Sequence, residues 1–289
     1  YAAVTQKIGF KMLQEGKTMG LAPLGRDIEK KFMHFSGVYS GIETSYEKVC
    51  VNGSYAMNIE HPPIESFEDK AKVAYEVQEE CEKAMLHLAQ YAKDMTGCDN
   101  LAISGGVALN SVANYKVLQS GIFKDVFINP AASDTGISLG AALYGLHKIG
   151  KKPKSYKEIS PYIGPAYSES DILKAIKENS GYKTISTNAF LEAAKFVNRG
   201  QILGLFQGRS EMGPRALGNR SIIMNPLKSE YKDVLNERVK FRESFRPFAP
   251  SILDEMKEEY FIIDRESPYM LFVPNVRSGK EKVIPAVIH

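Results

Sequence analysis

Residues 101–150 read LAISGGVALNSVANYKVLQSGIFKDVFINPAASDTGISLGAALYGLHKIG and contain the clearest structural pattern of the chain. Two short apolar runs, 101–104 and 125–128, have the length and composition of buried strands. Each leads through a glycine-containing loop into a predicted helix, the first over 107–121 and the second over 137–150. Strands that alternate with helices at these lengths are typical of α/β folds with parallel strands, so the sequence predicts that fold class.

A long helix is predicted ahead of this pattern, over about residues 65–96. Its apolar side chains recur at intervals of three or four residues, which gives one buried face. Gly97 follows directly and is the kind of residue that ends a helix. Before the helix, residues 46–59 mostly alternate between apolar and polar positions, which favours a β-strand. We therefore expect residues 1–150 to form a first domain.

The pattern changes at residues 151–165, which are basic and contain three prolines. This composition predicts an interdomain linker. Beyond it the sequence predicts two helices, then a strand at 201–207 and a late strand at 269–276. Residues 166–289 are therefore expected to form a second domain.

The composition excludes several classes of protein. An apolar fraction of 44% and a charged fraction of 25% in 289 residues are typical of a globular protein with a packed core. The formal charge of +3 is too mild for a nucleic-acid coat or a membrane-surface patch, and no run of about 18 apolar residues predicts a transmembrane helix. The three cysteines lack the spacing of a disulfide framework or a zinc site. We therefore expect a cytoplasmic protein without nucleic-acid or membrane partners.

The first loop after a predicted strand has features of a nucleotide site. Gly105 and Gly106 let backbone N–H groups approach a phosphate at the start of the next helix. Asn110 lies one turn further on, where its amide could bind a sugar hydroxyl. On spacing alone, however, a tight turn with Gly106 chosen for close packing is the better explanation.

The second loop, residues 129–136, adds a carboxylate. Asp134 lies near its end, where a metal ion or a phosphate-bound cation would be met. Taken alone, Asp134 is better explained as an N-cap of the following helix. Two such loops about thirty residues apart nevertheless favour a nucleotide cleft of the actin-like type. The five histidines lack the spacing of a histidine metal site.

Positive charge is concentrated in the predicted second domain. Residues 206–246 carry nine Lys and Arg against five Asp and Glu, and the resulting net charge of +4 exceeds the +3 of the whole chain. They include GRSEMGPRALGNRS, residues 208–221, which we call the arginine loop. Each of its three glycines lies within two residues of an arginine. Because guanidinium groups bind oxyanions in pairs and glycine-rich turns can expose N–H groups, the loop predicts a site for a polyanionic small ligand such as a triphosphate.

Two other interpretations of this charge are weaker. A merely solvated surface does not need Gly213 and Pro214 or flanking apolar strands. RNA binding usually brings interleaved aromatic side chains for stacking, and residues 207–240 contain only Tyr231. The phenylalanines that follow are spaced with prolines in a way that favours packing.

Five segments of the chain resemble the O-carbamoyltransferases of nodulation-factor and antibiotic biosynthesis. In chain order they are GKTMGLAPLG, ISGGVALNSVAN, NPAASDTGISLGAALYG, FQGRSEMGPRALGNRSI and VKFRESFRPFAPSIL. The resemblance covers nearly the entire chain, and the GRxExGPRALGNRSI string is very specific. It implies that residues 1–150 are the later part of an actin-like ATPase domain (ribonuclease H-like), akin to the universal tRNA threonylcarbamoyl-transfer protein. It also implies that residues 166–289 are an α+β domain like threonylcarbamoyl-adenylate synthase.

The resemblance implies an activity in two steps. The second domain of such enzymes makes carbamoyl adenylate from carbamoyl phosphate and ATP, and the actin-like domain then moves the carbamoyl group to a hydroxyl of a small-molecule acceptor. The acceptor is a sugar, a nodulation factor or an antibiotic-like molecule, and a divalent metal, iron or magnesium, is a further cofactor. Two alternatives stay open, namely threonylcarbamoyl transfer to tRNA and a nucleotide-binding fragment without turnover.

The resemblance also implies roles for individual residues. The catalytic residues, which would hold carbamoyl phosphate and the ATP phosphates, are Arg215, Lys240 and Arg246, and their supports are Arg209, Arg220 and Ser221. The residues around the adenylate are Gly20, Gly105, Gly106 and Asn110. Asp134 would be a metal ligand. The family's His-x-x-x-His metal motif does not occur here, and its C-terminal catalytic groups are also missing. With Tyr1 in place of Met, these departures predict a fragment of a longer protein and weaken the case for metal binding.

Overall fold

The computed structural model describes most of the chain, namely residues 1–33, 35, 38–41, 43–45, 50–51, 54–55, 61–151, 160–179, 181, 183 and 188–289. Most of the predicted strand over 46–59, and residues 152–159 of the predicted linker, lie outside these residues. We refer to residues 1–150 as the first half and to residues 166–289 as the second half.

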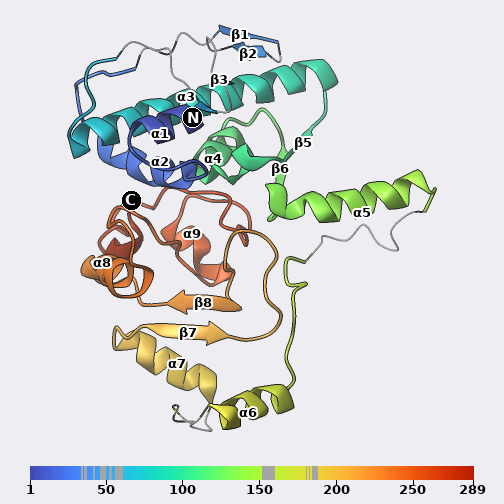
Figure 1. Cartoon of the computed structure of the whole chain (residues 1–289), viewed down its shortest axis with the longest axis vertical. Helices are drawn as coiled ribbons and strands as arrows, with labels where there is room; N and C mark the ends of the chain where they lie inside the picture. The colour runs from blue at the N-terminus through green and yellow to red at the C-terminus, as the bar shows by residue number, and fades with distance from the viewer. Residues whose placement is uncertain are drawn as a thin grey trace.

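The first half combines helices with short paired strands (Figure 1). Its helices and strands are, in chain order, α1 (Ala2–Lys7), α2 (Glu15–Leu21), β1 (Val38–Ser40), β2 (Glu43–Ser45), β3 (Cys50–Val51), β4 (Ser54–Tyr55), α3 (Phe67–Thr96), β5 (Asn100–Ile103), α4 (Ser111–Gln119), β6 (Asp125–Ile128) and α5 (Ile137–Lys148). The pairs β1–β2 and β3–β4 are antiparallel hairpins, whereas β5 and β6 are parallel. The parallel pair confirms the strand prediction for residues 101–104 and 125–128.

The second half is built around one antiparallel strand pair. Its helices and strands are α6 (Glu169–Glu178), α7 (Ala189–Asn198), β7 (Leu203–Phe206), β8 (Arg220–Ile223), α8 (Glu230–Leu235) and α9 (Lys257–Tyr260), with a π-helical turn at Asn236–Lys240. The arginine loop connects β7 to β8, and Phe206 pairs with Arg220 at its base. In Figure 1, α6 and α7 lie on one side of this pair, and the helical turns that approach the first half lie on the other.

The long helix α3 has well-defined ends. At its start the Asp69 N–H donates to Ser66 Oγ (3.0 Å), and the Asp69 carboxylate accepts from the Ser66 N–H (3.1 Å), which is a capping box. At its end Gly97 adopts a left-handed conformation with φ of +62°, as a C-cap glycine does. The predicted helix over 65–96 is confirmed.

Two hydrophobic clusters form the core, and each takes a buried side chain from the second half. The first surrounds α1, α2 and the start of α3, and it includes Phe245. The second surrounds α4, β6 and the end of α3, and it includes Leu271. Burying an aromatic or leucine side chain contributes about 1.5–3 kcal/mol, so each cluster helps to hold the two halves together. None of the described helices has both the length and the apolarity that a membrane-spanning segment needs.

One predicted strand differs from the structure, and one predicted helix forms as expected. The predicted strand at 269–276 is wrong: the segment is irregular, with one isolated bridge between Val276 and Phe261. The Asn114 side chain donates to the Leu271 carbonyl (3.1 Å) and so takes the place of a strand partner. The predicted helix at 137–150 forms as α5, but it has no buried side chain and projects from the body of the molecule (Figure 1).

The packing of α3 against residues 22–25 predicts the effect of Gly25→Ala. A Cβ at Gly25 would lie 2.1 Å from the Ala71 carbonyl oxygen, which is backbone and cannot rotate away. Overpacking of this kind costs about 1–3 kcal/mol, so urea denaturation should show a free energy of unfolding lowered by at least about 1 kcal/mol. Gly16→Ala, on α2 with nothing within 4 Å of the added methyl, is the control and should be neutral or slightly stabilising. Equal losses in both variants would contradict this packing.

Candidate functional site

The loop at 129–136 contacts both glycine-rich segments singled out from the sequence. The Gly105 N–H donates to the Ala132 carbonyl at 2.6 Å. Gly213 of the arginine loop has φ of +101° and lies so close to Pro130 that a Cβ there would be 2.5 Å from its carbonyl oxygen. Only glycine allows both this backbone conformation and this approach. The arginine loop therefore lies against the second predicted nucleotide loop, which the Gly105 hydrogen bond joins to the first.

A second contact between the halves joins α2 to the segment at 239–250. Lys17 Nζ and Glu243 Oε1 form an ion pair at 2.5 Å. Phe245 is buried, and its ring centre lies 6.1 Å from that of Phe10. A Cβ at Gly20 would lie 3.9 Å from Arg246 Cδ. Arg246 is thus held beside Gly20, one of the residues expected near the adenylate.

Three partly buried arginines, Arg215, Arg242 and Arg246, gather where these contacts meet. Burial, and then repulsion from Arg246, lowers the pKa of the Arg215 guanidinium. Burial and then repulsion from Arg246 lower the pKa of Arg242; the nearby Glu243 carboxylate opposes this shift, and Arg215 adds a smaller repulsion. Among the described residues, no carboxylate makes an ion pair with any of the three. We call them the arginine cluster. Like charges held close together cost free energy, and Glu243 offsets only part of it. The cluster is therefore a candidate site for an anion.

The remaining predicted residues of the arginine loop hold its shape. The Arg220 guanidinium donates to the carbonyls of Gln207 (2.6 Å) and Gly208 (3.3 Å) and stacks 3.7 Å from the Phe206 ring centre. Arg209 donates to the Gly164 carbonyl (3.0 Å). Ser221 Oγ accepts from a backbone N–H of the same loop. These side chains support the loop that carries Arg215.

The expectation that glycines in this loop expose N–H groups is wrong for residues 217–220. Glu211 Oε1 accepts the N–H of Leu217 (2.8 Å), Asn219 (2.8 Å) and Arg220 (3.3 Å), and Ser221 Oγ accepts that of Gly218 (2.9 Å). Burial raises the pKa of Glu211, but the amide hydrogen bonds outweigh it and hold the pKa below its ordinary value. An internal carboxylate therefore occupies this row of amides, and the guanidinium groups remain as the candidate anion-binding groups of this region.

The first nucleotide loop is open at its glycines. Gly105 has φ of +92°, and a Cβ at either Gly105 or Gly106 would meet nothing within 4 Å. Close packing therefore does not explain the Gly106 glycine, contrary to the simpler interpretation of the sequence. Asn110 instead caps α4, accepting the Ala113 N–H at 3.1 Å, and its amide is paired with Gln78.

The predicted metal ligand and the predicted lysine are both exposed. Asp134 starts a short 3-10 turn, and the capping positions belong to Ser133 and Gly136, so the N-cap interpretation of Asp134 is wrong. Across the described parts of the chain, no three His, Cys, Asp or Glu side chains gather as a metal site. The residues present therefore do not fit a divalent metal ion. Lys240 ends the π-helical turn that leads into the arginine cluster.

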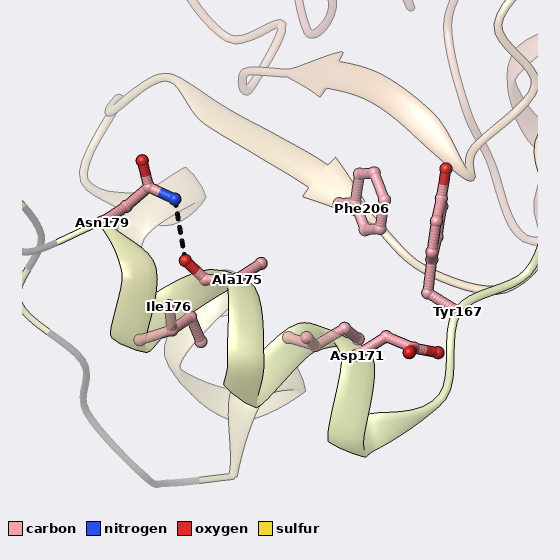
Figure 2. A pocket seen from close by; sticks show the side chains of 7 residues that line it. Tyr167, Asp171, Ala175, Ile176, Asn179 and Phe206 are labelled. Atoms are coloured by element: carbon pink, nitrogen blue, oxygen red, sulfur yellow. Dashed lines mark hydrogen bonds between the residues drawn. The ribbon is translucent and has the colours of Figure 1, made fainter.

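A separate open cavity of about 520 Å³ lies between α6 and β7 (Figure 2). Two of its polar side chains have partners: Asp171 accepts the Ser168 N–H (2.9 Å), and Asn179 donates to the Ala175 carbonyl (2.8 Å). The Tyr167 and Phe206 rings form the opposite wall, with centres 5.9 Å apart. Its lining contains no Lys or Arg side chain, so for an anion this cavity is a weaker candidate than the arginine cluster.

Comparisons with known proteins match this two-part arrangement. A family model described as carbamoyltransferase N-terminus matches residues 1–143, and one described as carbamoyltransferase C-terminus matches residues 194–289. The chain belongs to the carbamoyltransferase family. The candidate site of this family member therefore joins a loop of the N-terminal region to arginines of the C-terminal region.

Its relatives include nodulation proteins. Nodulation protein NolNO of Sinorhizobium fredii is 34% identical over 100% of this chain and 44% of its own length. Nodulation protein NolO of Bradyrhizobium diazoefficiens is 35% identical over 100% of this chain and 55% of its own length. Nodulation protein U of Rhizobium tropici is 36% identical over 70% of this chain and 33% of its own length. This carbamoyltransferase chain thus spans about half the length of the first two relatives.

Two residues of the site were not predicted from the sequence. Arg242 lies in the same short segment as Arg246, and that proximity is the signal that points to it. Glu211 belongs to the GRxExGPRALGNRSI string, but nothing in the string says that its carboxylate folds back onto the loop's own amides. In this carbamoyltransferase, both contribute to the site through contacts inside the second half.

The approach of the arginine loop to Pro130 predicts a difference between two glycine variants. Gly213 and Gly218 both have positive φ, +101° and +108°, but a Cβ at Gly218 would meet nothing within 4 Å. Each alanine substitution should cost about 1–2 kcal/mol of backbone strain. Gly213→Ala should lower the free energy of unfolding by at least about 1 kcal/mol more than Gly218→Ala, because its methyl group would clash with the Pro130 carbonyl. Equal free energies of unfolding for the two variants in urea would contradict the contact.

The amide contacts of Glu211 predict a pH-dependent stability. Its pKa is lowered in the folded chain, so the stabilisation is present above the unfolded pKa of about 4.3 and is lost as the pH falls through the folded value. Glu211→Gln should therefore lower the free energy of unfolding by about 1–2 kcal/mol at pH 7.

The difference between wild type and Glu211→Gln should shrink as the pH falls below about 4. Glu29→Gln, at an exposed position with no described partner, is the control and should stay close to wild type at every pH. If the difference in free energy of unfolding between wild type and Glu211→Gln does not change with pH, the charge of Glu211 does not contribute to stability, which would contradict this account.

Proposed function

We propose that this chain takes part in ATP-dependent O-carbamoyl transfer. In this proposal carbamoyl phosphate and ATP yield carbamoyl adenylate, and the carbamoyl group then passes to a hydroxyl of a small-molecule acceptor. The observation that carries the proposal is the arginine cluster, which is partly buried, makes no ion pair with a described carboxylate, and lies on segments that contact Pro130 and Gly20 of the first half. Membership of the carbamoyltransferase family supports a carbamoyl donor as the anion.

The chemistry explains why cations are needed. Carbamate is a poor acylating agent. Water hydrolyses carbamoyl phosphate to carbamate and inorganic phosphate, and one carbamate oxygen then attacks the α-phosphorus of ATP. The new O–P bond forms as the bond to the β-phosphate breaks, and pyrophosphate leaves. Negative charge develops on phosphoryl oxygens in this step, and preorganised guanidinium groups stabilise it.

The second step needs the adenylate to meet the acceptor. The acceptor hydroxyl attacks the carbamoyl carbon, the C–O bond to AMP breaks, and the hydroxyl proton passes to a base. Because carbamoyl adenylate is prone to hydrolysis, a site that is closed from water favours transfer. The contacts of Gly213 with Pro130 and of Gly20 with Arg246 support a short path between the regions.

We assign roles to the residues on this basis. Arg215, Arg242 and Arg246 bind carbamoyl phosphate and the phosphates of ATP, with Lys240 at the edge of the cluster. Gly105 and Gly106 allow the nucleotide to approach the first half. Asp134 alone offers one exposed carboxylate, so we derive no step through a metal ion.

We propose the same division of the fold that the resemblance implies. Residues 1–150 would be the later part of an actin-like domain, 151–165 a linker, and 166–289 a domain like threonylcarbamoyl-adenylate synthase. The parallel pairing of β5 and β6 supports the first assignment. The names of the relatives favour a nodulation factor or a similar hydroxylated sugar as acceptor.

The proposal predicts pyrophosphate release that depends on carbamoyl phosphate. The chain is incubated with ATP, carbamoyl phosphate and a set of hydroxylated sugars, and pyrophosphate is measured. Arg215→Ala should lower the rate at least about 100-fold, because it removes one preorganised donor to phosphoryl oxygens. Arg215→Lys should recover only part of the rate, since lysine keeps the positive charge but lacks the planar, paired N–H donors of a guanidinium group.

The control is Arg199→Ala, at an exposed arginine that ends α7, which should leave the rate unchanged. Unchanged release in Arg215→Ala would contradict the role of the cluster. ATP binding without carbamoyl-phosphate-dependent release would favour the nucleotide-binding alternative. Nucleic-acid affinity with a steep salt dependence would favour transfer to tRNA.

A further inference from the structure

Asn236 is a polar residue buried directly beneath the arginine cluster. It is the first residue of the π-helical turn after α8, and it is 0% exposed. A buried amide is costly unless its donors and acceptors are all paired. Its partners therefore show what the residue contributes to the fold.

All the side-chain partners of Asn236 lie in the segment that carries Arg242 and Arg246. Its Nδ2 donates to the carbonyls of Ser244 (3.3 Å) and Arg246 (3.0 Å). Its Oδ1 accepts from Arg242 Nε (2.7 Å), and its backbone carbonyl accepts the Arg242 N–H (3.1 Å). One residue thus fixes the backbone next to both arginines and the side chain of one of them.

The same segment contains a backbone conformation that needs support. Phe241 has φ of +47° and ψ of +53°, the left-handed region, although it is not glycine. Such a residue costs roughly 1–3 kcal/mol and persists only where its surroundings impose it. The Phe241 ring is 82% exposed, so its own packing does not hold the turn. The hydrogen bonds of Asn236 span the turn from the other side.

The side chain of Arg242 is further restricted. Its guanidinium donates to the Pro247 carbonyl (3.2 Å) and stacks 4.6 Å from the Phe248 ring centre. Together with the bond to Asn236, these contacts hold the Arg242 guanidinium in one position beside Arg246. A cluster fixed in this way loses little entropy when an oxyanion binds.

We propose that Asn236 is a positioning residue for the anion site. It imposes the left-handed turn at Phe241, so that Arg242 and Arg246 are presented to the same phosphate group as Arg215. It is not a catalytic residue, because it is buried and does not face the ligand. The inference rests on the proposed function for the identity of the ligand, carbamoyl phosphate.

The test uses Asn236→Ala and a rescue at Phe241, with carbamoyl phosphate binding measured by calorimetric titration. Asn236→Ala should raise the Kd for carbamoyl phosphate at least about tenfold, since misplaced arginines bind less well. In the double variant Asn236→Ala, Phe241→Gly, glycine adopts the left-handed turn at little cost. The Kd of the double variant for carbamoyl phosphate should be at least about threefold lower than the Kd of Asn236→Ala. A purely structural role for Asn236 would not give this rescue.

Matched variants separate the possible outcomes. Asn179→Ala removes another asparagine bond to a backbone carbonyl, on α6, and should leave the Kd unchanged. Where Asn236→Ala does not fold, Asn236→Ser, which keeps a small donor and acceptor, is compared with and without Phe241→Gly in the same titration. An unchanged Kd in the Asn236 variant, or a weakened Kd without rescue, overturns the positioning role. Failure of the wild-type chain to bind carbamoyl phosphate at all would instead count against the proposed function.

Discussion

Electrostatic repulsion among Arg215, Arg242 and Arg246 is the constraint that the rest of the structure has to meet. Three cations in a partly buried place raise the free energy of the empty fold. The nearest acidic side chain on the same segment, Glu243, is taken by Lys17 at 2.5 Å. Glu243 thus offsets only part of the positive charge of Arg242 and Arg246, and other contacts hold the segment in place.

Those contacts are what join the two regions matched by the carbamoyltransferase models. Phe245 and Leu271 each enter a hydrophobic cluster of the first half, and Gly213 meets the backbone at Pro130. The apolar contacts supply stability that the charged cluster lacks. Their positions also bring the arginine loop against the loop at 129–136, whose Ala132 carbonyl accepts the Gly105 N–H.

The sequence predicts the local features well, because they depend on neighbours in the chain. The parallel strands and the long helix with its Gly97 cap follow from short patterns. The roles of Arg215 and Arg246 come from the family resemblance and stay predictions. The features that the sequence did not predict depend on contacts between residues that are not neighbours in the chain. Nothing local shows that Asn114 would bond to the Leu271 carbonyl in place of a strand. The capture of amides by Glu211 likewise depends on how the loop closes on itself.

A crystal structure of the chain with ATP and carbamoyl phosphate bound tests most directly whether the arginine cluster binds an oxyanion. We expect phosphate oxygens within hydrogen-bonding distance of Arg215 and Arg246, and the nucleotide against the open backbone at Gly105 and Gly106. Ligand bound elsewhere, with the guanidinium groups facing solvent or paired with carboxylates of the chain, would contradict it.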